Sequence, residues 1–212
     1  MQSSIMNKVD RLFVLRDLAI LNNNHIAALD NLNMLASKII KTPVSLISMV
    51  AADHQFFKSH TGLPEPWRSR RQTPLSHSFC QHVVAKNQPL IVTDARENEL
   101  LKDNKAIPDL NVIGYLGIPL TLSDGSSLGS FCVIDSEPHE WDTMEISIMS
   151  ELAEIVIAEF EIRMKIRQRR ASQSDLFAIH GKINELVDIL SADMTQSEFL
   201  DALHTERDRL GL

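Results

Sequence analysis

The residues best suited to chemistry are a cysteine and two histidines in one short segment, His77, Cys80 and His82. Cysteine and histidine bind zinc, and a thiolate can also act as a nucleophile. On a helix, residues three apart share a face, whereas residues two apart do not. Only His77 and Cys80 would therefore point the same way, and two ligands do not make a structural zinc site. We predict no metal site, and the commonest role for Cys80 is that of a small buried apolar residue.

The second cysteine, Cys132, lies in the middle of an apolar run. Burial raises the pKa of a thiol and normally makes it inert. A redox-sensing role for Cys80 and Cys132 nevertheless stays open. No glycine-rich phosphate loop, paired carboxylates or Ser-His-Asp pattern can be placed in the sequence, so we expect no catalytic function.

The charge of the chain limits its partners. Its formal net charge is -7, which argues against a general affinity for nucleic acid or anionic membranes. The one basic cluster with an aromatic residue, residues 67–71, is expected to be a solvated loop or a lid over a pocket. No apolar run has membrane-spanning length, and two cysteines without a disulfide framework fit a reducing compartment. We expect a soluble cytoplasmic protein.

The element that must position these residues is an apolar hairpin over residues 113–135. Two apolar runs flank a polar Asp-Gly-Ser-Ser connection, the composition of a β-hairpin. The second run is apolar on both faces, so the hairpin should lie in the middle of a sheet covered on both sides. Pro119 lacks an N–H, which suggests an open side or a bulge at its position.

Periodicity predicts the remaining elements. We expect helices near residues 7–21, 25–41, 75–86 and 142–169, and strands near residues 44–50, 55–59 and 89–93. Asp142 and Glu145 resemble a capping box at the start of the long helix. A polar break should end that helix at residues 167–174, and a second capping box, Thr195 to Glu198, should open a last short helix.

The long helix carries two apolar stripes. The first comprises Met149, Ala153, Val156 and Phe160, and the second Ile148, Leu152, Ile155, Ile162 and Ile166. One stripe is enough to dock the helix on its own sheet. The second predicts another partner, either a helix of the same chain or the same helix of a second subunit.

Several blocks carry a family resemblance in order and with natural spacing. They are residues 16–21, 43–48, 53–59 with 62–64, 78–83, 89–94 and 128–135. Together these blocks resemble bacterial GAF domains, over roughly residues 9–163. The resemblance implies an α+β, GAF/PAS-like fold: a central antiparallel sheet with the N- and C-terminal helices on one face and a ligand pocket on the other. The expected organisation is a GAF domain with flanking helices at residues 1–170 and a C-terminal helical arm at residues 171–212.

The resemblance also implies the position of the pocket. Its wall should include Phe79, Cys80, Val83, Asp94, Asn98, Tyr115 and Phe131. Gly117 and Gly129 would leave room beside the sheet. The alternative is a collapsed pocket filled by the same aromatic side chains.

Other members of the family suggest alternatives that this sequence matches poorly. Phytochrome-like members attach a bilin to a cysteine followed at once by histidine, whereas Gln81 separates Cys80 from His82. Methionine-sulfoxide reductases of this fold use a third cysteine, and this chain has two. Cyclic-nucleotide binders carry an Asn-Lys pair that is missing from the corresponding segment here.

The resemblance therefore predicts a non-catalytic sensory or regulatory module. It would bind a small molecule of unknown identity or sense redox state, and act as a homodimer through its flanking helices on a histidine kinase or diguanylate cyclase partner. The alternatives are a ligand-free dimerisation or interaction module and, less favoured, a thiol-dependent reductase or a bilin photoreceptor.

Overall fold

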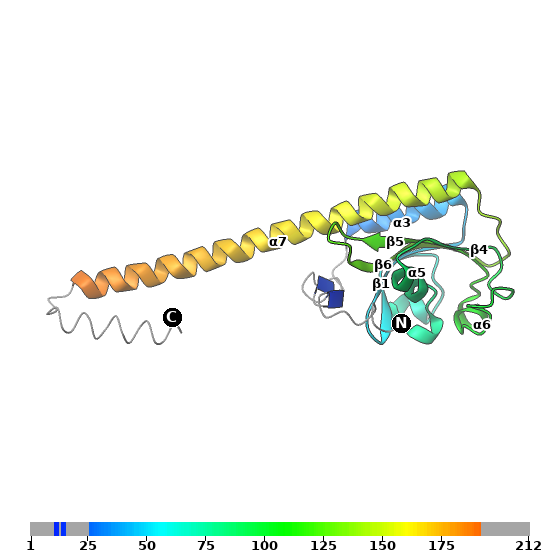
Figure 1. Ribbon diagram of the computed structural model, residues 1–212, viewed down its shortest axis with the longest axis horizontal. Helices are drawn as coiled ribbons and strands as arrows, with labels where there is room; N and C mark the ends of the chain where they lie inside the picture. The colour runs from blue at the N-terminus through cyan, green and yellow to red at the C-terminus, as the bar shows by residue number, and fades with distance from the viewer. Residues whose placement is uncertain (1–10, 13, 16–25, 192–212) are drawn as a thin grey trace. The chain divides into compact units, whose positions relative to one another are not determined.

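A six-stranded antiparallel sheet organises the chain (Figure 1). This computed structural model describes residues 11, 12, 14, 15 and 26–191. The strands lie in the order β3-β2-β1-β6-β5-β4. Their bounds are β1 (Val44–Val50), β2 (His54–Thr61), β3 (Gln72–Pro74), β4 (Leu90–Val92), β5 (Gly114–Thr121) and β6 (Ser127–Asp135).

Helices cover both faces of this sheet, which confirms the predicted α+β arrangement (Figure 1). On one face α3 lies beside the first part of α7, and on the other lie α5 and α6. The helices are α3 (Ala27–Ile40), α4 (Trp67–Arg70), α5 (Cys80–Lys86), α6 (Ala106–Leu110) and α7 (Thr143–Ser191), with a 3₁₀ turn, η1 (Leu75–His77). Within the described residues, no helix combines the length and apolar character that crossing a membrane requires.

The central hairpin forms as the sequence predicts. Eight of the nine residues of β6 are buried, because β1 and β5 flank the strand and helices cover both its faces. β4 pairs with β5 only as far as Gly117, so Pro119 meets no ladder partner on that side. A register shift follows between Leu120 and Thr121. Pro119 still pairs with Ser130 of β6, but on the β4 side its missing N–H leaves no ladder bond unmade.

Helix α3 buries a different stripe from the one its leucines suggest. Its buried residues are Leu29, Asn33, Ala36 and Ile40. Asn33 is buried because its Oδ1 accepts a hydrogen bond from the hydroxyl of Ser45 on β1, at 2.8 Å. Leu35 and Ile39 are exposed, although both are apolar. Hydrophobicity alone missed the polar residue that anchors the helix.

The start of α7 confirms the predicted capping box. The Glu145 N–H donates to the Asp142 carboxylate at 2.8 Å, and the Asp142 N–H donates to the Glu145 carboxylate at 2.9 Å. The first stripe, with Met149, Val156 and Phe160, is buried, whereas Ile155 and Ile162 of the second are exposed. Glu161 accepts from the N–H of Ser123, which ties the helix to the β5–β6 turn.

The predicted end of this helix is wrong. Residues 167–174 continue the helix, which runs to Ser191. That segment is rich in arginine and glutamine, which are good helix formers, and holds no proline or glycine, so polarity alone did not end it. Internal contacts divide the chain into two units, Met1–Arg163 and Met164–Leu212.

Two predicted helices fall largely outside the described residues. The helix expected after the Thr195 capping box lies outside them entirely. Of the helix expected at residues 7–21, the four described residues are helical. Among these, Arg11 is buried and donates to the carbonyl oxygen of Val50 at 2.6 Å, at the end of β1.

The segment expected as one helix at residues 75–86 is divided. Ser78 has extended backbone angles, φ -110° and ψ 120°, and separates η1 from α5. The Ser78 hydroxyl accepts from the N–H of Gln81 and so caps the start of α5. This break sets the direction in which Cys80 enters the interior.

A histidine joins the sheet to the start of α7. His139 Nδ1 lies 3.0 Å from an oxygen of Asp135 at the end of β6, and its Nε2 lies 3.1 Å from an oxygen of Glu145. Its ring stacks on Trp141 with 3.9 Å between ring centroids. Burial lowers the pKa of His139, but the hydrogen bonds and charges of Asp135 and Glu145 outweigh it, so this pKa is raised.

This arrangement predicts a pH-dependent stability. Because the pKa of His139 is higher in the folded than in the unfolded chain, its contribution is complete below the unfolded value of about 6.5 and disappears as pH rises through the folded value. Urea unfolding should show the wild type losing about 0.5–1 kcal/mol more than His139→Gln between pH 6 and pH 8.5. Equal losses in the two proteins would contradict the assignment.

Candidate functional site

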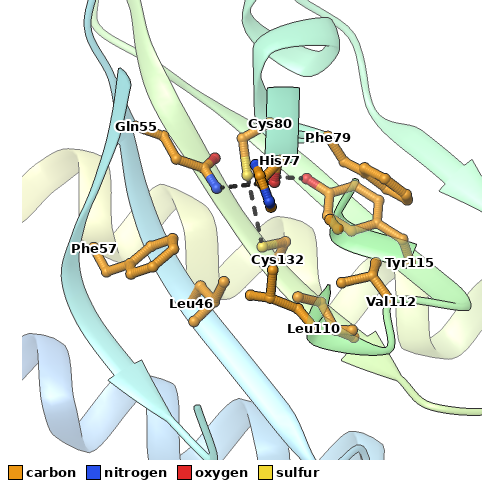
Figure 2. A pocket seen from close by; sticks show the side chains of 12 residues that line it. Leu46, Gln55, Phe57, His77, Phe79, Cys80, Leu110, Val112, Tyr115 and Cys132 are labelled. Atoms are coloured by element: carbon orange, nitrogen blue, oxygen red, sulfur yellow. Dashed lines mark hydrogen bonds between the residues drawn. The ribbon is translucent and has the colours of Figure 1, made fainter. Parts of the chain in front are cut away.

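The candidate site is a small cavity on the face of the sheet covered by α5 and α6 (Figure 2). Its volume is about 20 Å³, room for a single water molecule. Its wall is mostly apolar and comprises Leu46, Gln55, Phe57, His77, Phe79, Cys80, Ala106, Leu110, Val112, Tyr115, Cys132 and Ile134. The pocket is therefore present but nearly filled by its own side chains.

Two free cysteines meet in this wall (Figure 2). The Sγ atoms of Cys80, from the first turn of α5, and Cys132, from the middle of β6, are 3.9 Å apart. Both are buried. The Tyr115 hydroxyl donates to Cys80 Sγ at 3.3 Å and lies 3.4 Å from the Ser130 hydroxyl. Two thiols and a phenol thus form one polar cluster inside an apolar wall.

Gly117 brings Tyr115 into this cluster. Tyr115 and Gly117 lie on the same face of β5, and Gly117 pairs with Cys132 on β6. A Cβ on Gly117 would collide with the hydroxyl and ring of Tyr115. The ring folds over the glycine toward Cys80 because the space is empty. Gly117 thus leaves room beside the sheet, and a side chain of this protein occupies it.

The two thiols have opposite electrostatic environments. The hydrogen bond with Cys132 lowers the pKa of Cys80, the hydroxyl of Tyr115 lowers it further, and together they outweigh the effect of burial. Burial raises the pKa of Cys132 well above its ordinary value. Burial likewise raises the pKa of Tyr115, which stays protonated and able to donate. Cys80 is therefore the sulfur that ionises first.

Gln55 closes one side of the cavity and has all its hydrogen bonds satisfied. Its Oε1 accepts from the hydroxyls of Ser78 at 2.6 Å and Ser48 at 3.3 Å. Its Nε2 donates to the hydroxyl of Thr73 at 2.7 Å and to the carbonyl oxygen of His77 at 3.4 Å. An amide with four partners has no capacity left for a ligand, so Gln55 is a structural part of the wall.

His77 and Leu110 form the partly exposed rim. His77 Nε2 lies 2.9 Å from a carboxylate oxygen of Asp109 on α6. The His77 ring also contacts Trp67 on α4, with 5.3 Å between centroids. This contact puts α4, in the segment expected to be a solvated loop or a lid, beside the rim of the cavity.

The structure brings some of the expected site residues together and separates others. Phe79, Cys80 and Tyr115 line the cavity, and Val83 is buried in the same core cluster one turn further along α5. Asp94 is instead held by Arg96, which donates through Nε at 2.8 Å. The Asn98 side chain accepts from the N–H of Leu100 and caps a turn.

Phe131 requires a correction. Side chains alternate along β6, so Cys132 and Ile134 face the cavity while Phe131 faces the helices on the other side. Gly129 also differs from expectation, because a Cβ there would collide with the carbonyl oxygen of Ser48. It allows close approach of β1 rather than room for a ligand.

Sequence reasoning missed most of the wall. Leu46, Phe57, Val112 and Ile134 are ordinary core residues in the sequence, and only the register of the strands turns them toward one cavity. The alternation of side chains along β6 could have placed Cys132 on the cavity face, because Tyr115 and Gly117 share that face on the neighbouring strand β5.

The GAF domain family matches residues 9–159. The chain belongs to the GAF domain family. A curated relative is a cyclic di-GMP phosphodiesterase of Pseudomonas aeruginosa, 31% identical over 125 residues, which make up 58% of this chain. The match covers 20% of the relative, so the chain corresponds to about a fifth of its length.

Solved structures share the fold. The GAF domain of an Acinetobacter phosphoenolpyruvate-protein phosphotransferase matches with a TM-score of 0.55 and 15% identity, over 74% of this chain and 96% of that one. A domain of a putative two-component sensor histidine kinase from Sinorhizobium meliloti gives 0.54 and 17%, over 68% and 96%. A free methionine-R-sulfoxide reductase from Neisseria meningitidis gives 0.55 and 16%, over 71% and 86%. The family therefore supports a sensory or regulatory module.

The chemistry available at the site is limited. Among the described residues, no group of three His, Cys, Asp or Glu side chains could hold a metal ion. The polar groups that face the thiols are hydroxyls, from Tyr115, Ser48 and Ser130. Such a site can hold a very small molecule or change its sulfur oxidation state.

The position of the Tyr115 ring gives a testable prediction. Gly117→Ala should destabilise the protein by about 1–3 kcal/mol, because the new methyl group displaces the ring. In a Tyr115→Ala background the same change should cost close to nothing. Denaturant unfolding of the four proteins measures this coupling. An equal cost in both backgrounds would show that the ring is not what excludes a side chain at Gly117.

Proposed function

We propose that this GAF domain is a non-catalytic, cytoplasmic sensory module. A small molecule or a redox event at the cavity alters its sheet, and paired flanking helices of a homodimer pass the change to a signalling partner. Histidine kinases and enzymes of cyclic di-GMP metabolism are the partner classes that the relatives suggest.

The observation that carries the proposal is that β6 touches both sides of the molecule. Cys132 lies in the cavity wall, while the adjacent Phe131 is buried under the helices on the opposite face. β6 is flanked by β1 and β5, so a shift at Cys132 is carried by the same backbone to the helix face. Ligand binding or oxidation at the cavity can thus act on α3 and α7 through one strand. The effect would be a shift in population between two arrangements of these helices.

The outer faces of these helices offer a surface for a second copy. Five exposed apolar side chains lie there: Met34, Leu35 and Ile39 on α3, and Ile155 and Ile162 on α7. Ile155 and Ile162 lie seven residues apart, the spacing of residues that pack between two helices in a coiled coil. In the single chain they are 52% and 53% exposed, so the described residues leave that face uncovered. An isologous dimer would bury the same stripe from both subunits.

A second function is favoured by the size of the cavity. About 20 Å³ holds one water molecule, far below the several hundred Å³ of ordinary ligand sites. On this alternative the domain binds nothing and serves only for dimerisation or partner recruitment. The same volume argues against a bilin.

Dimerisation can be tested with charge in the stripe. Ile155→Glu combined with Ile162→Glu should weaken self-association at least about 100-fold, because unpaired carboxylates are costly to bury in an interface. Light scattering across a concentration series measures the effect, and circular dichroism checks that the fold is retained. Ile91→Glu is the matched control, since Ile91 is 46% exposed on the edge strand β4. A wild-type monomer, or a double variant that remains dimeric, would contradict the helix-mediated assembly.

Occupancy of the cavity can be tested by native mass spectrometry of the protein purified from its own host. The ligand-sensing account predicts an added mass per subunit that is lost in Ala106→Leu, which fills the cavity, while the dimer persists. A bare wild-type protein that no small molecule stabilises against heat would instead favour the ligand-free alternative.

A further inference from the structure

We propose that Cys80 and Cys132 are a modification site, where a hydroperoxide closes an intramolecular disulfide between α5 and β6. This inference rests on the proposed function only in naming its redox input. The two cysteines lie 52 positions apart in the sequence, and the fold alone brings them together.

The geometry favours closure. The Sγ atoms are 3.9 Å apart, and a disulfide holds them at about 2.05 Å, so they must approach by roughly 2 Å. Cys132 belongs to a strand paired on both sides and cannot shift alone. Cys80 stands in the first turn of a seven-residue helix, beyond the extended residue Ser78. The approach is therefore chiefly a movement of α5 toward the sheet, and the remaining displacement of Cys132 is shared by the whole of β6.

The reaction balances with hydrogen peroxide as the oxidant. The Cys80 thiolate attacks the peroxide, the O–O bond breaks, and Cys80 becomes a sulfenic acid with release of hydroxide, which takes up a proton to give water. The Cys132 thiol then attacks the sulfenic sulfur, the S–S bond forms, and a second water leaves. Two electrons pass from the two thiols to the peroxide, and a dithiol reductant reverses the step.

The surroundings assign the first role to Cys80. Its sulfur accepts a hydrogen bond from the Tyr115 hydroxyl, which stabilises a thiolate. Burial raises the pKa of Cys132, so that thiol remains protonated until the sulfenic acid forms beside it. Tyr115 is accordingly a positioning residue that acts through the sulfur of Cys80.

The cavity limits which oxidants react. Both cysteines line it, and its rim residues His77 and Leu110 are partly exposed. A space of about 20 Å³ admits a molecule near the size of water after a small opening. Hydrogen peroxide, with two heavy atoms, is among the smallest oxidants and needs only a modest further opening, whereas bulky disulfides such as glutathione disulfide should react much more slowly.

Formation of the disulfide changes the contacts around Cys80. The bond from Tyr115 to the Cys80 thiolate is lost, and the nearest hydroxyl left to Tyr115 is that of Ser130. Phe79, which directly precedes α5, and Val83, one turn along it, move with Cys80 and compress the apolar wall. The linked form should also unfold about 5 °C or more higher, because the bond closes a long loop.

The test exposes the folded full-length chain to hydrogen peroxide, traps remaining thiols with N-ethylmaleimide under denaturing conditions, and measures intact mass and linked peptides. The expected product is two hydrogen atoms lighter, carries no maleimide, yields a Cys80–Cys132 cross-linked peptide and returns to the dithiol with dithiothreitol. Cys80→Ser and Cys132→Ser should not form it. If Cys132→Ser fails to fold, Cys132→Ala takes its place.

The variant Tyr115→Phe tests whether the hydroxyl of Tyr115 activates Cys80 or whether the ring only fills space. It should slow the reaction about tenfold near neutral pH and shift the pH dependence of the rate upward, because the thiolate loses its donor. Ser130→Ala removes a hydroxyl from the same cluster but leaves the hydrogen bond from Tyr115 to Cys80 in place, so it is the matched control and should have a smaller effect.

Three results would overturn the inference. They are two thiols that survive peroxide in the folded protein but oxidise on unfolding, a sulfinic acid at Cys80 without a cross-link, and a disulfide between subunits. Failure of the proposed function is distinguishable from these. If the cross-link forms reversibly but the packing of α3 and α7 does not change, the modification site stands and the proposed signalling function fails. If native mass spectrometry finds a ligand and the thiols do not react, the sensory function stands and the modification site fails.

Discussion

Burial of β6 on both faces is the constraint on which the rest of the structure depends. The strand can be covered twice only if helices lie above and below the sheet, and α3 with α7 on one side and α5 with α6 on the other meet that requirement. Its alternating side chains then divide the interior in two. Cys132 is assigned to the cavity and Phe131 to the helix layer by this parity alone.

The same constraint explains why the cavity is small. The apolar face of the sheet is buried by other apolar side chains, which pack closely. Phe57, Phe79 and Tyr115 therefore fill the space that a ligand would need. The polar groups left inside are satisfied by one another: Gln55 by four partners and Tyr115 by Cys80. The two cysteines are the buried side chains of this wall that can change covalently.

Much of this architecture could be predicted from local patterns. The hairpin, the Asp142–Glu145 capping box and the first stripe of α7 depend on residues close in sequence, and all three form as expected. The burial of Asn33 could not be predicted, because its partner Ser45 lies on a different element. The end of α7 was missed because polar residues that are good helix formers do not stop a helix.

The site was predicted less completely than the fold. Cys80 and Tyr115 were assigned to a pocket by resemblance, and both line the cavity. Phe131, Asp94 and Asn98 do not, because parity turns the first away and local hydrogen bonds hold the other two. The approach of the two sulfurs depends on the tertiary position of α5, which no sequence spacing encodes.

The central claim is that a chemical change at the cavity, such as oxidation of its cysteines, alters the packing of α3 and α7 through β6. Hydrogen–deuterium exchange of the reduced and the peroxide-treated protein, compared peptide by peptide, tests it most directly. The account predicts changed protection in α5 and, beyond the sheet, in α3 and residues 143–163 of α7. A change confined to α5 and the cavity wall, with both helices unaltered, would contradict it.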